Sequence, residues 1–406
     1  MISKITGKLR SNWIVVLPIA SAAASFILSF WLKIILTPEA YGDFATAFFT
    51  VNVLLGLGVV GYDQVIIRLS KLTERGLEID KWIVMIGVLI LLLTPGLSFV
   101  FLSAFGVVSE FSLGYLFMSW MAACIAVLAI LFNLQGRLLE SYFFLGSWKV
   151  VLLLTVSVLY LVQLAMDEFE LLILFSLAGT FVWLLVFRKR IFYLVKGQLD
   201  AKSVYLLYFS SVISLVSYQA FEGLDRFLLL STFDKVLFGD YFFVFNFLLA
   251  PTSIFVSYYT VKRLKIYKAR FSYVLMFRDY VNVSVFSVLS GLCLLGVIYS
   301  IVVFGVVSFS SLDFSSVLIV LCLCVVRNGY LVLSAAYKVV ASKSTLLFVA
   351  ILFGMLSILV CSFSSRFEIS FQLNELILVV LGLWLLRILL YFYVILNDSN
   401  KILKLT

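Results

Sequence analysis

The sequence predicts an all-α integral membrane protein with about twelve transmembrane helices in two six-helix lobes. Three observations lead to this fold class. Of the 406 residues, 64% are hydrophobic and only 13% are charged, whereas a soluble domain carries about 25% charged residues. The apolar residues form long unbroken runs, such as residues 83–93 and 376–386. A short motif also recurs at matching places in the two halves of the chain.

The scarcity of charge excludes whole classes of protein. So few charged residues cannot cover the surface of a soluble chain of this length, which excludes a cytosolic enzyme, a secreted disulfide scaffold and a disordered chain. The apolar runs are too continuous for a membrane β-barrel, whose strands alternate over about 10 residues. The first run, residues 13–36, exceeds the apolar core of about 7–15 residues in a signal peptide, so we expect it to be retained.

The residues needed for metal and histidine chemistry are missing from the sequence. It contains no histidine, which is the commonest metal ligand and general base. All five cysteines lie in apolar runs, where thiols are mostly packing residues. No Gly-x-x-x-x-Gly-Lys-Ser/Thr phosphate loop occurs. These absences exclude a metal site and a histidine-based catalytic triad, whereas carboxylate chemistry stays open. We expect no cofactor and name no catalytic residue.

Dividing the apolar runs at charges and turn residues gives the expected spans, each of about 20 residues, the length that crosses a bilayer. They are residues 13–36, 44–67, 82–106, 112–134, 148–166, 170–187, 204–231, 236–260, 280–306, 315–338, 344–363 and 373–396. No loop is long enough to fold as a separate soluble domain. The expected lobes are residues 1–196 and 197–406.

Basic residues are sorted by this topology. With a cytoplasmic N-terminus and alternating spans, 24 of the 30 basic residues fall in cytoplasmic segments, Lys149 among them. Two, Arg327 and Arg387, lie inside spans. This positive-inside bias predicts that both termini are cytoplasmic. The net charge of +9 then needs no nucleic-acid partner, because attraction to anionic membrane lipid explains it.

The recurring motif is a Gly-Asp pair flanked by aromatic residues. Gly42-Asp43 aligns with Gly239-Asp240 at an offset of 197 residues, close to half the chain. Both pairs fall where an odd span meets the next even one, so we expect the glycine to allow a tight turn and the aspartate to cap the following helix. Six spans per half would make the repeat parallel, with its axis along the membrane normal.

The motifs resemble a known family. Residues 36–44, Leu-Thr-Pro-Glu-Ala-Tyr-Gly-Asp-Phe, look like the first outer turn of polysaccharide flippases in the MOP (multidrug/oligosaccharidyl-lipid/polysaccharide) superfamily. Residues 61–68, Gly-Tyr-Asp-Gln-Val-Ile-Ile-Arg, look like the end of their second helix. Residues 225–229, 238–241 and Pro251 are similar to their seventh and eighth helices. The resemblance covers nearly the whole chain, and the closest type is the Wzx O-antigen flippase.

The resemblance implies a transporter rather than an enzyme. It implies that the chain moves an undecaprenyl-diphosphate-linked oligosaccharide across the bacterial inner membrane by alternating access, in O-antigen and lipopolysaccharide biosynthesis. Because no ATP-binding loop is present, energy is expected from an ion gradient or from removal of the product. Expected partners are the lipid-linked glycan, membrane lipid, and polysaccharide polymerase and chain-length proteins; the protein is expected to be a monomer.

Ionisable residues in or beside the expected spans are functional hypotheses, because each costs about 2.5–3.5 kcal/mol in the bilayer centre. Arg327 and Arg387 are expected to face the bundle interior and bind the diphosphate or an acidic sugar, with a structural ion pair as the alternative. The expected substrate-binding residues are Arg327, Arg387, Arg226 and Lys33; the expected ion-coupling or gate residues are Asp63, Glu222, Asp225 and Arg68.

Several pairings within this set are open. Glu222 and Arg226 are four residues apart and could pair on one helix face, whereas Glu222 and Asp225 could share a proton or hold a sodium ion. Lys33 could pair with Glu222 or Asp225 to close an outer gate, or it could snorkel to water. Arg68 is alternatively an interface anchor.

Two rival functions fit the membrane class. A polysaccharide polymerase or ligase would be an enzyme, but such enzymes typically carry a large external loop with catalytic arginine or histidine residues, and here the outer loops are short. A drug or cation antiporter of the same superfamily would share the architecture. A purely structural membrane protein is disfavoured by the charges inside the spans.

Overall fold

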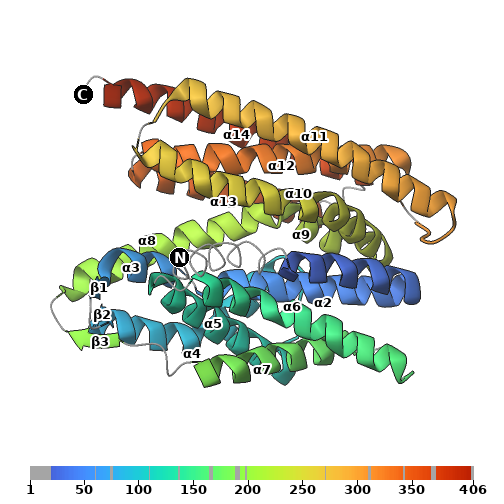
Figure 1. Ribbon diagram of the computed structural model, residues 1–406, viewed down its shortest axis with the longest axis horizontal. Coiled ribbons are helices and arrows are strands. Elements are labelled where there is room, and N and C mark those ends of the chain that lie inside the picture. The colour runs from blue at the N-terminus through green and yellow to red at the C-terminus, as the bar shows by residue number, and fades with distance from the viewer. Residues whose placement is uncertain are drawn as a thin grey trace, which may run out of the picture. The chain divides into compact units, whose positions relative to one another are not determined.

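The computed structural model describes residues 20–403 except 60, 74–75, 109, 136–137, 164–167, 188–192, 197–198, 270, 310–311, 342 and 367–371. Residues 1–19, with the first part of the expected span 13–36, lie outside the described residues. The described helices are Ala20–Ile35, α2 (Pro38–Leu57), α3 (Tyr62–Leu69), α4 (Lys81–Ala104), α5 (Leu113–Leu134), α6 (Leu138–Leu161), α7 (Phe169–Phe187), α8 (Ala201–Glu222), α9 (Leu224–Thr232), α10 (Lys235–Ala269), α11 (Tyr273–Val303), α12 (Phe314–Val340), α13 (Lys343–Arg366) and α14 (Leu373–Leu403) (Figure 1).

The lengths and composition of the helices are those of an α-helical, multi-pass membrane protein. Ten of them, within the described residues, are long and apolar enough to cross a membrane. Two shorter apolar helices, Ala20–Ile35 and Phe169–Trp183, accompany them. Several long helices begin at a side chain that accepts a hydrogen bond from their first turn, as polar N-cap residues do; these caps are Asp80, Ser112, Asp200, Ser272 and Asp313.

Two expected spans are divided, which corrects the prediction of one continuous helix for each. Residues 44–67 fall in α2 and α3, which are separated at Gly61, where the backbone turns into the left-handed region at φ 79°. Residues 204–231 fall in α8 and α9, and Gly223 lies between the two helices. Glycine adopts the left-handed conformation at Gly61 readily because it has no Cβ. At Gly61 it also permits close approach, since a Cβ there would lie 2.7 Å from the backbone carbon of Ser211.

The start of the fifth expected span is also wrong. α6 begins at Leu138, ten residues before the expected start at residue 148. Lys149, expected in a cytoplasmic segment, therefore lies inside the helix and within the candidate membrane span Phe143–Leu161. The lysine suggested a boundary because charge normally ends a span, whereas the apolar residues before it continue the helix.

A small sheet adds strands to a fold that was expected to be all helix. β1 (Lys71–Thr73) and β2 (Gly76–Asp80) form an antiparallel pair, and β3 (Tyr193–Lys196) runs parallel to β2. Asp80 fixes the end of β2, because its carboxylate accepts hydrogen bonds from the amides of Trp82 and Leu199, each at 2.9 Å. The segment before α4 is thus bonded to the segment that follows α7.

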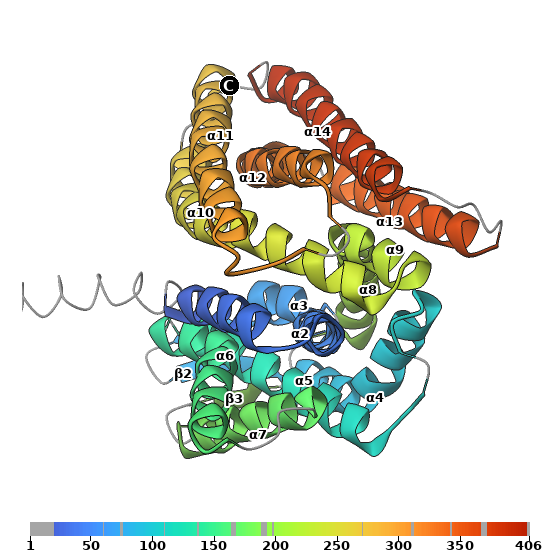
Figure 2. The same cartoon turned by 90° about the vertical axis from the view of Figure 1, so that its right-hand side faces the viewer.

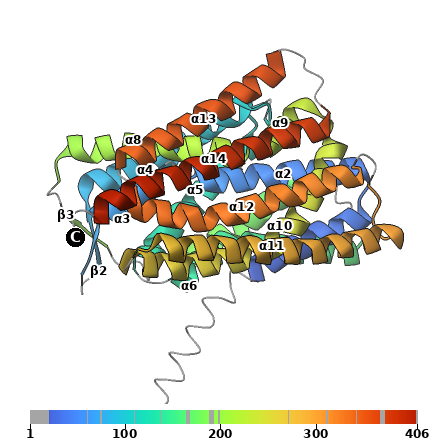
Figure 3. The same cartoon turned by 90° about the horizontal axis from the view of Figure 1, so that it is seen from above.

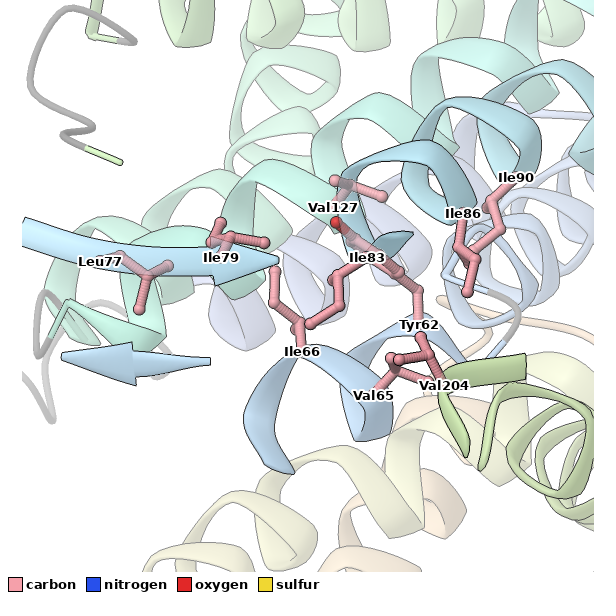
Figure 4. Close-up of a cluster of buried hydrophobic side chains, with 10 residues drawn as sticks. All are labelled: Tyr62, Val65, Ile66, Leu77, Ile79, Ile83, Ile86, Ile90, Val127 and Val204. Atoms are coloured by element: carbon pink, nitrogen blue, oxygen red, sulfur yellow. The ribbon is translucent and has the colours of Figure 1, made fainter. Parts of the chain in front are cut away.

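The chain divides into two compact units, and unit 1 contains Met1–Leu28, Asp43–Gly223 and Gly354–Cys361. Within it α5 packs against α4, α6 and α7. Figure 4 shows where α3, α4, α5, α8 and β2 meet, around a buried cluster. Its members are Tyr62, Val65, Ile66, Leu77, Ile79, Ile83, Ile86, Ile90, Val127 and Val204. The strands therefore share a core with the helices that they adjoin.

Unit 2 contains Ser29–Gly42, Leu224–Phe353 and Ser362–Thr406. α12 is its central helix and packs against α10, α11 and α14. Figure 2 shows α12 end-on between α11 and α14, and Figure 3 shows α11, α12 and α14 running side by side. α8 belongs to unit 1 and Ser29–Gly42 to unit 2. The expected lobes, residues 1–196 and 197–406, stay predictions. The two-lobe repeat stays a prediction.

Candidate functional site

Unit 2 buries an unusual number of charged side chains for a protein with so few. Each belongs to a helix whose other buried residues are mostly apolar, and a buried charge is tolerated only when a partner or a hydrogen bond compensates its lost hydration. The buried charged residues of unit 2, each less than a tenth exposed, are Lys33, Asp225, Asp240, Asp279, Arg327 and Arg387. Four of the six lie in the expected site.

Lys33 forms a buried ion pair with Asp240. The Lys33 Nζ lies 2.5 Å from the Asp240 Oδ1, and the two residues are 207 positions apart in the chain. The ammonium also lies 4.9 Å from the ring centroid of Tyr41, whose hydroxyl is 2.6 Å from the Ser29 hydroxyl. The expected pairing of Lys33 with Glu222 or Asp225 is therefore wrong. The helix Ala20–Ile35 turns this lysine toward the second turn of α10 instead.

The two Gly-Asp motifs meet at this ion pair. A Cβ on Gly239 would lie 3.1 Å from the Cα of Gly42, so the two glycines permit close packing of their helices. Neither glycine makes a turn, since both lie inside helices at negative φ. Nor does Asp240 cap α10: the cap is Asp234, which accepts a hydrogen bond from the Leu237 amide at 2.8 Å. The expected turn and cap are thus both wrong.

Asp225 is the centre of a second buried group. It lies at the start of α9, and its Oδ2 accepts a 2.6 Å hydrogen bond from the Tyr241 hydroxyl. Its Oδ1 lies 3.5 Å from the Arg226 Nε and 3.6 Å from the Arg327 Nη1. Both guanidinium groups also lie over the Phe245 ring, at 5.3 and 4.9 Å from its centroid. One carboxylate and one aromatic ring therefore serve two arginines.

Arg387 is held by aromatic rings. Its guanidinium carbon lies 4.7 Å from the ring centroid of Tyr330 and 5.6 Å from that of Tyr391, and its Nη2 is 3.4 Å from the Tyr391 hydroxyl. The Trp384 ring contacts Arg387 on α14 and Arg327 on α12, at 5.7 and 5.1 Å. Cation–π contacts of this kind replace part of the hydration that a buried guanidinium loses. Both arginines thus lie in the interior of unit 2, and Arg327 makes the kind of ion pair that was the alternative to substrate binding.

The remaining site residues fall elsewhere. Glu222 is the last residue of α8 and belongs to unit 1, while Asp225 lies in the first turn of α9 in unit 2. The single helix face that was expected to carry both carboxylates is therefore interrupted at Gly223. Arg68 lies exposed in the last turn of α3. The side chain of Asp63 lies outside what the structure describes.

Sequence reasoning missed several members of the buried groups. Asp240 was visible in the repeated motif but was interpreted as a helix cap. Asp279 was not singled out; it accepts hydrogen bonds from the hydroxyls of Tyr259 and Tyr267, both at 2.8 Å, and lies 3.1 Å from the Arg263 Nη2. Its position near the start of an apolar run was the available signal, since a carboxylate there requires partners. This group ties α10 to α11.

No cluster of three or more histidine, cysteine, aspartate or glutamate residues that could hold a metal ion occurs among the described residues. No protein-family model, curated protein or solved structure matches the chain. Function is therefore inferred from the chain's own residues.

Proposed function

We propose that the protein is a lipid-linked oligosaccharide flippase of the bacterial inner membrane, with an undecaprenyl-diphosphate-linked repeat unit as its cargo. The observation that carries most weight is the set of buried, paired charges inside a multi-pass helical protein. Such charges are costly in a membrane and commonly belong to substrate or ion pathways. The motif resemblance to Wzx-type flippases of the MOP superfamily supplies the class of substrate.

The helices support a twelve-span topology. The ten long apolar helices together with Ala20–Ile35 and Phe169–Trp183 make twelve apolar helices. The pairing of β2 with β3 supports the alternation, because it requires that the segments before α4 and after α7 lie on the same side of the membrane. Four helices separate those segments, and an even number of crossings returns the chain to its starting side. With the positive-inside bias, that side is cytoplasmic.

Contact between Gly42 and Gly239 supports the internal repeat. In a protein with two halves related by a two-fold axis, residues close to the axis meet their own equivalents, and these two glycines are equivalent by sequence. Their aspartates differ: Asp240 is buried against Lys33, while Asp43 is exposed. The residue equivalent to Lys33 in the second half is Leu230. The halves have therefore diverged where charge is involved.

Transport needs these charges to exchange partners. Asp225 holds Arg226 and Arg327, and the phosphoryl oxygens of a diphosphate are the kind of group that can replace a carboxylate beside a guanidinium. Arg226 is the more accessible arginine, with 16% of its side chain exposed against 6% for Arg327. We expect cargo to meet Arg226 first.

Deletion of the gene in a bacterium that makes a long-chain surface polysaccharide tests the proposal. We expect loss of that polysaccharide, with lipid-linked repeat units accumulating on the cytoplasmic face of the membrane. Loss of a polymerase would differ, because single repeat units would still reach the surface. Intact long-chain polysaccharide without accumulated repeat units would refute the proposal. Resistance to cationic dyes on expression would instead indicate an antiporter.

Rescue by variants tests the site within the same strain. Arg327→Gln removes the charge beside Asp225, so we expect it to lower polysaccharide export, while Arg327→Lys keeps a cation and should retain part of it. The matched control is Lys338→Met, which removes an exposed basic residue from the last turn of the same helix. Equal protein levels in the membrane are required for the comparison. Full polysaccharide export by the Arg327→Gln variant would refute a role for this arginine in substrate binding.

A further inference from the structure

Lys149 is a charged side chain that the proposed function does not use. It lies in α6 (Leu138–Leu161), eleven residues after the first residue of the helix and within the candidate span Phe143–Leu161. At 1.5 Å per residue it is roughly 16 Å along the helix from Leu138. The residue is half-buried. A lysine inside a span keeps its stem in hydrocarbon while its ammonium extends toward a polar group.

The contacts of its ammonium are aromatic. The Lys149 Nζ lies 5.5 Å from the ring centroid of Phe48 on α2 and 5.6 Å from that of Trp148. Among the described residues no carboxylate and no hydrogen-bond acceptor contacts it. Lys33 in unit 2 differs, because its ammonium is paired with a buried aspartate. Aromatic faces attract a cation but do not accept its protons as an oxyanion does.

Trp148 supplies a second donor beside the lysine. The residue is fully buried, and its indole Nε1 has no hydrogen-bond acceptor within the part of the chain that the structure describes. Its ring packs on Phe48 with centroids 5.0 Å apart, which fixes its position. Buried polar groups are nearly always hydrogen-bonded, so an unsatisfied indole N–H next to an uncompensated ammonium requires an explanation.

The group that would satisfy an ammonium and an indole N–H together is an anion with more than one acceptor oxygen. A phosphoryl group carries several oxygens, so it can accept from the ammonium and the indole together, and lysine binds phosphate as a point charge. We propose that Lys149 and Trp148 of α6 bind a phosphoryl group, which comes either from a bilayer lipid headgroup or from the diphosphate of the cargo. The second source, unlike the first, depends on the proposed flippase function.

Native mass spectrometry of the purified full-length protein in detergent tests the site. The probes are phosphatidylglycerol, undecaprenyl diphosphate and, as a phosphate-free lipid, diacylglycerol. We expect at least one phosphorylated probe to bind, and diacylglycerol not to bind. Lys149→Met should weaken phosphoryl binding at least about tenfold, the effect of losing one charge-assisted hydrogen bond. Lys149→Arg should retain most of it, and the control Lys338→Met should leave it unchanged.

The two sources are separated by the probe that responds. A loss confined to phosphatidylglycerol assigns the site to bilayer lipid and leaves the flippase proposal to the deletion experiment, whereas a loss for undecaprenyl diphosphate assigns it to the cargo. Trp148→Phe keeps the ring and removes the N–H, so it gives a second measurement if Lys149→Met does not fold. We expect it to weaken binding several-fold. Wild-type affinity for both phosphorylated probes in folded Lys149→Met or Trp148→Phe would overturn the proposal.

Discussion

The buried pair of Lys33 and Asp240 provides a quantitative prediction about stability. At 2.5 Å the two charges attract by about 7 kcal/mol with an effective dielectric constant of about 20. That attraction offsets the lost hydration of both groups, so removing one partner leaves an uncompensated buried charge. We expect Lys33→Met and Asp240→Leu each to lower the free energy of unfolding by about 3–5 kcal/mol.

The double variant distinguishes pairing from loss of packing. Lys33→Met combined with Asp240→Leu buries two apolar side chains and no charge, so its cost should be at most about 2 kcal/mol. The free energies come from reversible unfolding in mixed micelles of increasing sodium dodecyl sulfate content, followed by circular dichroism. The difference between the double variant and the summed single variants then measures the coupling, which should be at least about 3 kcal/mol.

Asp43 provides the matched control, because it is the sequence equivalent of Asp240 but is exposed. Asp43→Leu should change the free energy of unfolding by no more than about 1 kcal/mol, as for a surface charge. The reasoning is refuted if the single variants at Lys33 and Asp240 each cost under about 1 kcal/mol and their effects add. Additivity would mean that the two charges do not depend on each other for stability.

Three further outcomes follow from the contacts. Gly42→Ala should lower the free energy of unfolding by about 1–3 kcal/mol, because its Cβ would collide with the backbone carbonyl of Lys235, whereas Gly382→Ala has open space and should be neutral or stabilising. Asp80→Ala should lower the free energy of unfolding by about 2–4 kcal/mol, because it leaves two backbone amides without their acceptor. Asp80→Asn keeps one acceptor oxygen and should lower it by less. Hydrogen bonds lower the pKa of the exposed Asp313 from 3.8 to about 2; the largest effect comes from the Ser315 hydroxyl and the next from the hydroxyl and amide of Ser316. The ionised Asp313 therefore contributes stability that is complete above pH 4 and disappears as the pH falls through about 2. Asp313→Asn can still cap the helix but does not titrate, so its thermal unfolding should lack this pH dependence. Identical pH profiles for the variant and the wild type would contradict the assignment.

The sequence predicted the helices better than their interruptions. A continuous apolar run of about 20 residues has few structures open to it in a bilayer, so helical spans follow directly from composition. The break at Gly61 could not be foreseen from the run alone, because it depends on the close approach of Ser211 from a distant segment. The sheet escaped prediction for the same reason: β3 is separated from β2 by four helices, and neither strand forms alone.

Some of the buried charges could be predicted from the sequence, but their partners could not. A charge in an apolar run is conspicuous by its cost, which is why Lys33, Arg327 and Arg387 could be named in advance. The choice of Asp240 as the partner of Lys33 depends on the approach of two helices 207 residues apart, which local spacing does not encode. Lys149 was misplaced because a charge was taken to end a span, when a lysine stem can lie within one.

The small sheet has a consequence for the synthesis and membrane insertion of the protein. β2 leaves the ribosome with one edge unpaired, and its parallel partner β3 follows only after α4 to α7 have been made. If one of those helices failed to cross the bilayer, β3 would emerge on the opposite side from β2 and the ladder could not close. The ladder between β2 and β3 therefore closes only in a chain that has returned to the side on which α4 begins by the time β3 is made.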